Sequence, residues 1–138
     1  MAHRISLVLI LMIFWGCSKR ISSKAVIGSW WSLQEDSTYF EVYINEEQFV
    51  FNHESYGPIY YEYLLVNDSL FISDRQKSSV KKWKIVEISD SKLVFKSDWG
   101  EIDLHIIPLE KTFFEIQYDS IGFVNFQEEF IKRYLEKS

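Results

Sequence analysis

Cys17 is the residue whose type and position most clearly suggest chemistry, because it is the only cysteine among 138 residues. It follows an apolar run from Ile5 to Gly16, which only Ser6 interrupts, and it precedes a basic stretch. The run is too short to span a bilayer, which takes about 20 apolar residues. It has the length of the apolar part of a secretory signal, and His3 and Arg4 supply the basic start of such a signal. An exported lone thiol has no disulfide partner, and a terminal segment lacks the packed surroundings that activate a catalytic thiol. We therefore expect Cys17 to be modified.

The residues around the thiol, Phe14-Trp15-Gly16-Cys17, resemble the lipobox of bacterial lipoproteins. The resemblance implies that residues 1–16 are a signal peptide, that Cys17 carries diacylglycerol-linked chains such as palmitate, and that the protein is a membrane lipoprotein of the bacterial cell envelope, on the periplasmic side of the outer membrane. More than one chain matters physically, because a single acyl chain binds a bilayer only marginally. The residues alone leave a second interpretation open, a plain signal anchor whose cysteine is incidental.

Other residues that could support catalysis are few and poorly placed. Besides His3, the histidines are His53 and His105, and no His or Cys spacing matches a metal-ligand motif. The chain has no Gly-x-Ser-x-Gly elbow and no glycine-rich phosphate loop. The adjacent acid pairs Glu46-Glu47 and Glu128-Glu129 are expected to be solvated. We therefore expect no enzyme activity, no metal and no cofactor.

The charge of the chain excludes one class of partner. Without residues 1–16, which contain Arg4, 14 basic side chains face 20 acidic ones, a net charge of −6. An acidic chain without a basic stripe does not suit nucleic acid, whose phosphates require clustered Lys and Arg. Residues 17–24, which include Lys19, Arg20 and Lys24, are expected to form a short acylated tether whose basic residues suit anionic head groups. A protein partner cannot be identified from the sequence.

From Ala25 onward the apolar residues alternate with polar ones, as in Phe40, Val42 and Ile44 or Ile102, Leu104 and Ile106. Alternation over short segments rich in aromatic and β-branched residues is typical of half-buried strands. No connection is long enough for a crossover helix, so the strands should follow one another as an antiparallel meander. The predicted strands are 26–34, 38–44, 48–53, 59–66, 70–74, 79–88, 92–97, 102–109 and 112–118.

The turns between these strands recur at a constant spacing. Asn45-Glu46-Glu47, Asn67-Asp68-Ser69 and Ser89-Asp90-Ser91 start 22 residues apart, and Glu110-Lys111 continues the series. Asn, Asp and Ser suit tight turns because their side chains bond to nearby backbone. The spacing puts all tight turns at one end of the sheet and the looser loops at the other. Eight or nine strands would leave exposed edges if flat, so we predict an all-β, up-and-down barrel.

Two features of this barrel resemble the lipocalin family. Gly28-Ser29-Trp30 on the first strand is similar to the Gly-x-Trp motif that opens lipocalins. The segments 66–72 and 88–95 are similar to hairpins of the small lipocalin-like domains of bacterial lipoproteins. The resemblance covers about residues 25–118, and it implies that Gly28 and Trp30 have a structural role in which Trp30 plugs the closed end of the barrel.

The barrel interior is the candidate binding site. Eight strands enclose a space that side chains fill or that holds one small ligand. The apolar, partly phenolic set expected to face inward would suit a small hydrophobic or amphipathic ligand; it consists of Phe40, Phe49, Phe51, Tyr61, Tyr63, Trp83, Phe95 and Leu104. The mouth should lie at the loop end, which carries Tyr56, Arg75, Lys77 and Trp99. The alternative is a filled barrel that binds a macromolecule through its loops or outer surface.

The end of the chain has helical spacing instead. Apolar residues at 126, 130, 131, 134 and 135 form one stripe, and Asn125 followed by Glu128 resembles a capping box. We therefore predict a domain over residues 25–138, in which a helix at 125–136 packs on the outside of the barrel.

Overall fold

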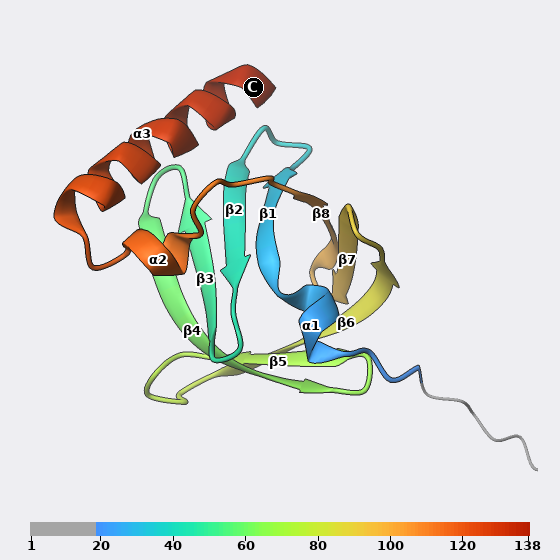
Figure 1. Cartoon of the computed structure of the whole chain (residues 1–138). Coiled ribbons are helices and arrows are strands. Elements are labelled where there is room, and N and C mark those ends of the chain that lie inside the picture. Colours follow the sequence, from blue (N-terminus) through green and yellow to red (C-terminus); the bar gives the residue numbers. More distant parts are fainter. Residues whose placement is uncertain (1–18) are drawn as a thin grey trace, which may run out of the picture.

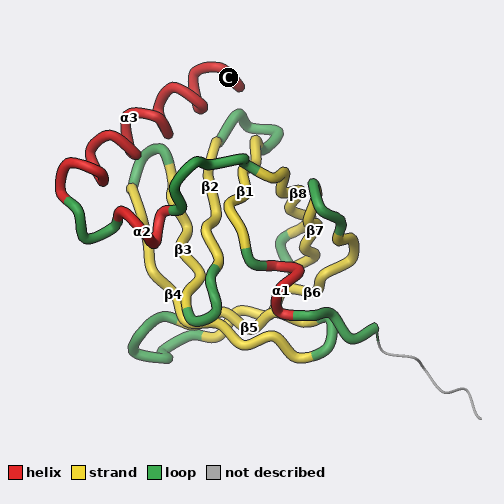
Figure 2. The backbone as a smooth tube through the Cα atoms, viewed as in Figure 1, coloured by secondary structure: helices red, strands yellow, loops and turns green. Residues whose placement is uncertain are grey.

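The computed structural model describes residues 19–138, so the predicted signal peptide and Cys17 lie outside the described residues. Eight strands, each antiparallel to the next, form a closed barrel in the order β1 to β8 (Figures 1 and 2). The strands are β1 Gly28–Leu33, β2 Tyr39–Ile44, β3 Gln48–His53, β4 Gly57–Val66, β5 Ser69–Ser73, β6 Val80–Ile88, β7 Lys92–Ser97 and β8 Gly100–Ile106. The predicted all-β, antiparallel up-and-down barrel is confirmed.

Closure of the barrel depends on a short seam between its first and last strands. β1 and β8 pair at Trp30–Ile106 and Trp31–His105, whereas most neighbouring strands pair over five or six residues. Because β8 pairs with β1, the ring closes without a ninth strand. The barrel therefore has eight strands.

The predicted ninth strand at 112–118 is wrong, because these residues contain the short helix α2, Phe113–Ile116. The Glu115 carboxylate accepts hydrogen bonds from the Thr112 N–H at 2.6 Å and from the Thr112 hydroxyl at 2.9 Å. These bonds fix the first turn of α2 and lower the pKa of Glu115. Phe113 is completely buried, which holds α2 against the barrel wall.

The C-terminal helix α3 spans Ser120–Lys137 and lies outside the barrel, as predicted, but it begins earlier than expected. Its N-cap is Asp119, whose side chain accepts a hydrogen bond from the Ile121 N–H, so the predicted cap at Asn125 is wrong. Gly122 makes room for this cap, because a Cβ there would lie 2.7 Å from the Asp119 carboxylate. A glycine that usually weakens a helix thus allows this one to start.

A third helix, α1 (Ser23–Val26), lies at the closed end of the barrel, and β1 therefore begins at Gly28 rather than near residue 26. Ile21, which lies two residues before α1, and Val26, its last residue, belong to the core inside the barrel. The Ile21 N–H also donates to the Asn67 carbonyl in the β4–β5 turn at 3.1 Å. None of the three helices within residues 19–138 has the length and apolar composition needed to cross a membrane.

Two hydrophobic clusters hold the domain together. The larger fills much of the barrel, and the smaller joins the outer wall of β2 and β3 to α2 and α3 through Tyr43, Val50, Phe113, Ile116 and Phe126. Within residues 19–138, the two clusters draw on residues from Ile21 to Phe126, and the eight strands lie within residues 28–106. The barrel and the helices that cover it are thus joined by a shared core.

Candidate ligand site

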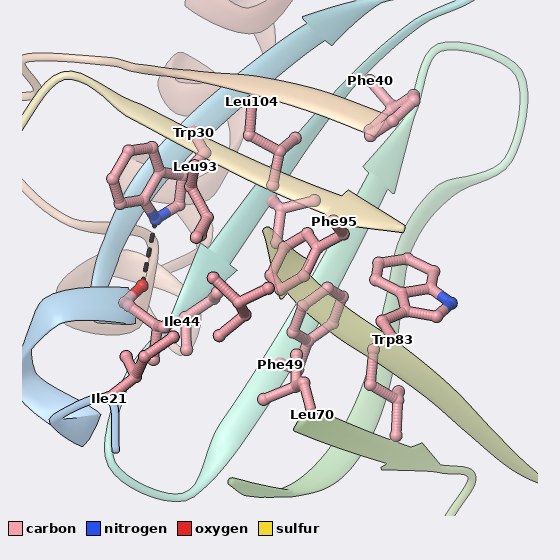
Figure 3. Packing of buried hydrophobic residues seen from close by; sticks show 14 residues of the cluster. Ile21, Trp30, Phe40, Ile44, Phe49, Leu70, Trp83, Leu93, Phe95 and Leu104 are labelled. Atoms are coloured by element: carbon pink, nitrogen blue, oxygen red, sulfur yellow. Dashed lines mark hydrogen bonds between the residues drawn. The ribbon is translucent and has the colours of Figure 1, made fainter. Parts of the chain in front are cut away.

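The floor of the barrel is closed by Trp30 and α1. Trp30 is 1% exposed, and its indole N–H donates to the Val26 carbonyl at 3.1 Å (dashed in Figure 3). Gly28 has a φ of 155°, and a Cβ there would lie 3.3 Å from the Trp30 ring nitrogen. The spacing of Gly28 and Trp30 thus lets the indole fold back under the barrel. Trp30 lies beside Ser89 and Asp90, so it is at the end where the tight turns are.

A cavity of about 240 Å³ occupies the opposite half of the barrel. Figure 3 shows the core residues along the barrel, with Trp30 and Ile21 at one end and Phe40 and Trp83 at the other. The cavity wall is largely aromatic and consists of Gln34, Phe40, Phe49, Phe51, Tyr61, Ile72, Lys81, Trp83, Trp99 and Ile102. The barrel is thus solid at its floor and hollow towards its mouth.

The eight residues that the sequence analysis placed inside the barrel all belong to its core or pack against it. Five of them, Phe40, Phe49, Phe51, Tyr61 and Trp83, line the cavity. The other three do not. Phe95 and Leu104 are completely buried, and Tyr63 donates its hydroxyl proton to the Asn45 carbonyl at 2.5 Å, near the tight-turn end.

Contacts between rings stiffen the cavity wall. The centroids of Phe40 and Phe51 are 4.7 Å apart, and Trp83 packs edge-on against Phe49 at 5.8 Å. Phe95 packs against Trp83, and their ring centroids are 5.4 Å apart. Such pairs add to the energy of apolar burial and fix the ring orientations. The wall is therefore preorganised for a flat or apolar guest.

Lys81 is the charged group at this cavity, and the sequence analysis missed it. Its ammonium nitrogen lies 4.9 Å from the centroid of the Trp99 ring, a cation–π contact. Among residues 19–138, no acidic side chain forms an ion pair with Lys81. Lys81 lies two residues before the inward-facing Trp83, so the period-two pattern of the strand predicts that the Lys81 side chain lies on the same, inner side of the wall. Gln34 is the other polar group missed, and its amide donates to the Ser32 hydroxyl at 2.7 Å.

Of the four predicted mouth residues, Trp99 alone lines the cavity. Tyr56 stacks on His53 with ring centroids 4.8 Å apart, in the β3–β4 loop. Arg75 lies 5.9 Å from the Tyr60 ring, and Lys77 lies in the same β5–β6 loop with a φ of 52°. The predicted residues are therefore on the loops of the open end, but the structure does not gather them around one site.

A groove lies beside the cavity, between β6 and β7. These strands pair only from Lys84–Lys96 towards the floor, because residues 80–83 pair with β5 alone. The gap forms a second hollow of about 260 Å³, lined by Val80, Lys81, Lys82, Trp83, Ser97, Asp98 and Trp99. Lys81, Trp83 and Trp99 border both spaces. The two hollows are therefore adjacent, one inside the barrel and one at its side.

Comparisons with known proteins give a weak structural similarity and no match in sequence. No family model matches the chain, and no curated protein matches its sequence significantly. Among solved structures, the chain is similar to a lipocalin-like protein from Bacteroides uniformis, with a TM-score of 0.45 and 13% identity. The match covers 60% of this chain and 99% of that one.

Proposed function

We propose that this protein is a lipid-anchored protein of the bacterial envelope that binds a small amphipathic ligand in the open half of its barrel. The observation that carries the proposal is the cavity of about 240 Å³, with its aromatic wall and with Lys81 at its rim. A few placed polar groups on an apolar, concave surface are the usual composition of a small-molecule site. In the alternative interpretation, side chains would fill the whole barrel and leave no such cavity.

The size of the cavity restricts the ligand. Sites for drug-sized molecules usually measure about 300–1,000 Å³, so this one accepts a smaller guest or only part of a longer one. A longer ligand would keep its remainder in the groove between β6 and β7. There the ammonium group of Lys81 would meet an acidic or strongly polar head group, while the tail contacts Phe49 and Trp83.

The proposed anchor agrees with this orientation. Cys17 lies three positions before Arg20, and the chain from Arg20 to Ser23 runs beside the β4–β5 turn at the tight-turn end. A lipid on Cys17 would thus hold the barrel near its floor and leave the mouth accessible. Binding and anchoring are separable properties, and each has its own test.

Binding is tested on residues 19–138 with a fluorescent short-chain fatty acid. We expect saturable binding, which Ile102→Trp should weaken because the larger ring occupies the cavity. Val86→Trp adds the same bulk at an outer position that is 45% exposed, and it should bind like the parent. Absence of probe binding in the parent would contradict the proposal and favour the filled-barrel alternative, in which the outer surface contacts a macromolecule.

The preference for an acidic head group is tested with two lysines of β6 whose side chains lie on opposite sides of the barrel wall. Lys81→Met should weaken binding of the acidic probe about tenfold or more, since hydrogen bonds to charged groups are worth about 1.5–3 kcal/mol. Lys84→Met removes the same charge from the outer face, at a position that lines neither hollow, and it should leave binding unchanged. Equal losses in both variants would show that Lys81 acts only through net charge.

A further inference from the structure

One outer wall of the barrel lacks a covering helix. α2 and α3 pack on the side of β2 and β3, while β5 lies on the opposite side of the molecule with its outer surface uncovered (Figure 1). We define the β4–β6 face as six outward side chains of these three strands. It comprises Leu64 and Val66 of β4, Phe71 of β5, and Val80, Lys82 and Lys84 of β6.

The strand register gathers the apolar residues of this face. Leu64 pairs with Phe71, which in turn pairs with Lys82, so the three side chains form one row across the wall. Leu64 is 62% exposed, Val66 45% and Val80 61%, and Phe71 is half-buried. Contiguous exposed apolar residues on a soluble domain usually mark a surface that contacts something else.

Basic residues border this apolar row. The Lys82 ammonium lies 5.8 Å from the centroid of the Phe71 ring and takes part in no ion pair among residues 19–138. Lys84 lies on the same face and pairs loosely with Asp68 at 3.6 Å. The outward acids of these strands are Glu62, in the row nearer the mouth opposite Ser73, and Glu87 of β6, which pairs with Lys92 of β7 at 3.5 Å. The floor end of the face is therefore basic and apolar, although the whole chain is acidic.

The N-terminal segment leaves the domain beside this floor end. The Ile21 N–H bonds to the Asn67 carbonyl, and residues Arg20 to Ser23 form an open groove of about 600 Å³ with Leu65, Val66 and Asn67. Figure 1 shows the chain leaving next to one end of β5. Three residues extend at most about 11 Å, so a lipid on Cys17 would keep this end of the face close to the bilayer. Lys19, Arg20 and Lys24 add positive charge there.

The other exposed apolar surface fits a bilayer less well. Ile121, Val124, Ile131 and Leu135 form an exposed stripe on α3. On this helix Glu128, Glu129 and Glu136 outnumber the exposed bases Lys132 and Lys137, since Arg133 is paired with the buried Glu41. The helix also lies far from the N-terminal segment (Figure 1). Acidic residues near an anionic surface are repelled, so α3 serves as the internal comparison for the β4–β6 face.

We infer that the β4–β6 face docks on the surface of an anionic bilayer, with Leu64, Val66 and Phe71 in the head-group region and Lys82 and Lys84 against lipid phosphates. Apolar contact combined with attraction to anionic lipids is the usual basis of interfacial binding. The inference rests on the proposed membrane anchor, and it fixes an orientation in which the barrel lies on its side. The groove between β6 and β7 then opens close to the lipid surface, where an amphipathic ligand would be found.

The test supplies the anchor artificially, so that it does not depend on acylation of Cys17 or on ligand binding. A hexahistidine tag replaces residues 1–18, and nickel-chelating lipid holds the tag on vesicles of phosphatidylethanolamine and phosphatidylglycerol. Residues 19–138 contain no cysteine, so Leu64→Cys provides a single site for a polarity-sensitive dye. Ile131→Cys, on the exposed stripe of α3, provides the matched control. The readout is quenching of the dye by a water-soluble reagent.

We expect vesicles to protect the dye at position 64 several-fold against quenching, and to leave the dye at position 131 as accessible as it is in solution. Lys82→Glu with Lys84→Glu should remove the protection, as should phosphatidylcholine vesicles, while the tag keeps the protein bound. Equal accessibility at both positions, or protection at position 131 instead, would overturn the inference. Protection at position 64 without vesicles, at raised protein concentration, would assign the face to a second copy of the chain and would overturn it too.

Discussion

Arg133 of α3 reaches across to the barrel wall and binds the completely buried Glu41 of β2 through two parallel hydrogen bonds. Arg133 Nε lies 2.7 Å from Glu41 Oε1, and Nη2 lies 2.9 Å from Oε2. The hydroxyls of Tyr39 and Tyr43 donate to the same carboxylate at 2.6 and 2.5 Å. All four contacts compensate the charge of Glu41, so this network positions the helix on the barrel.

Removing the arginine should destabilise the domain strongly. Arg133→Met leaves the Glu41 carboxylate buried without its cation, and breaking a buried ion pair in this way costs about 3–5 kcal/mol. Urea unfolding followed by circular dichroism measures the change. Lys132→Met is the control, because the neighbouring pair of Lys132 with Glu129 is exposed, and it should unfold near the parent midpoint. Similar unfolding of both variants would show that the buried pair does not hold α3.

The same network predicts a loss of stability in alkali. Burial, and then the charge of Glu41, raises the pKa of Tyr39 and Tyr43 above the ordinary value of 10. Because the folded state keeps these protons more tightly than the unfolded state, the stabilisation is complete below pH 10 and declines as the pH rises further. Spectroscopic titration should show Tyr39 and Tyr43 ionising only as the protein unfolds. Ionisation of all tyrosines before unfolding would contradict this prediction.

Gly28 is predicted to be required for the floor of the barrel. Gly28→Ala introduces a positive φ strain and places a Cβ against the Trp30 indole, and such backbone strain costs about 1–3 kcal/mol. Gly57→Ala is matched in having a positive φ of 71°, but a Cβ there meets no atom within 4 Å. Gly28→Ala should therefore be the less stable variant and should change the Trp30 fluorescence. If the two variants have equal stability, contact with Trp30 is unimportant.

The proposed anchor has a direct test in cells. The full chain should incorporate radioactive palmitate and partition into detergent, because two or more acyl chains give stable membrane binding. Cys17→Ser should abolish the labelling and leave an uncleaved precursor. Processing that continues unchanged in this variant would rule out the lipoprotein interpretation and would favour a plain signal.

The parts of the fold that the sequence predicted are those that local patterns determine. Period-two alternation located the strands to within about three residues, and the turn residues Asn67 and Asp68 marked a hairpin end, where Asn67 indeed has a positive φ of 56°. The helix α2 was missed because Phe113 and Glu115 also fit an alternating pattern. Only the closure of the barrel by β8 decides against another strand.

The parts that were missed depend on contacts between distant segments. Tyr39, Glu41 and Tyr43 alternate with the core residues of β2 and looked solvent-facing, yet all three are completely buried. Their burial comes from α3, which is some 90 residues away in the chain, since Glu41 and Arg133 are separated by 92 positions. Lys81 was missed for a different reason, because an exposed lysine at the rim of the barrel does not look like a residue that lines an apolar cavity.

The central claim, that a ligand occupies the open half of the barrel, is tested most directly by fluorine NMR. Residues 19–138 contain four tryptophans, and fluorotryptophan reports on each of them. Trp83 and Trp99 line the cavity, Trp30 lies at the floor, and Trp31 packs on His105, whose ring centroid is 4.9 Å away. Addition of a short-chain fatty acid should shift the Trp83 and Trp99 signals at saturating concentration and leave those of Trp30 and Trp31 in place. If the Trp83 signal does not move while the acid binds, or if only the Trp31 signal moves, the ligand does not occupy the cavity and the account is wrong.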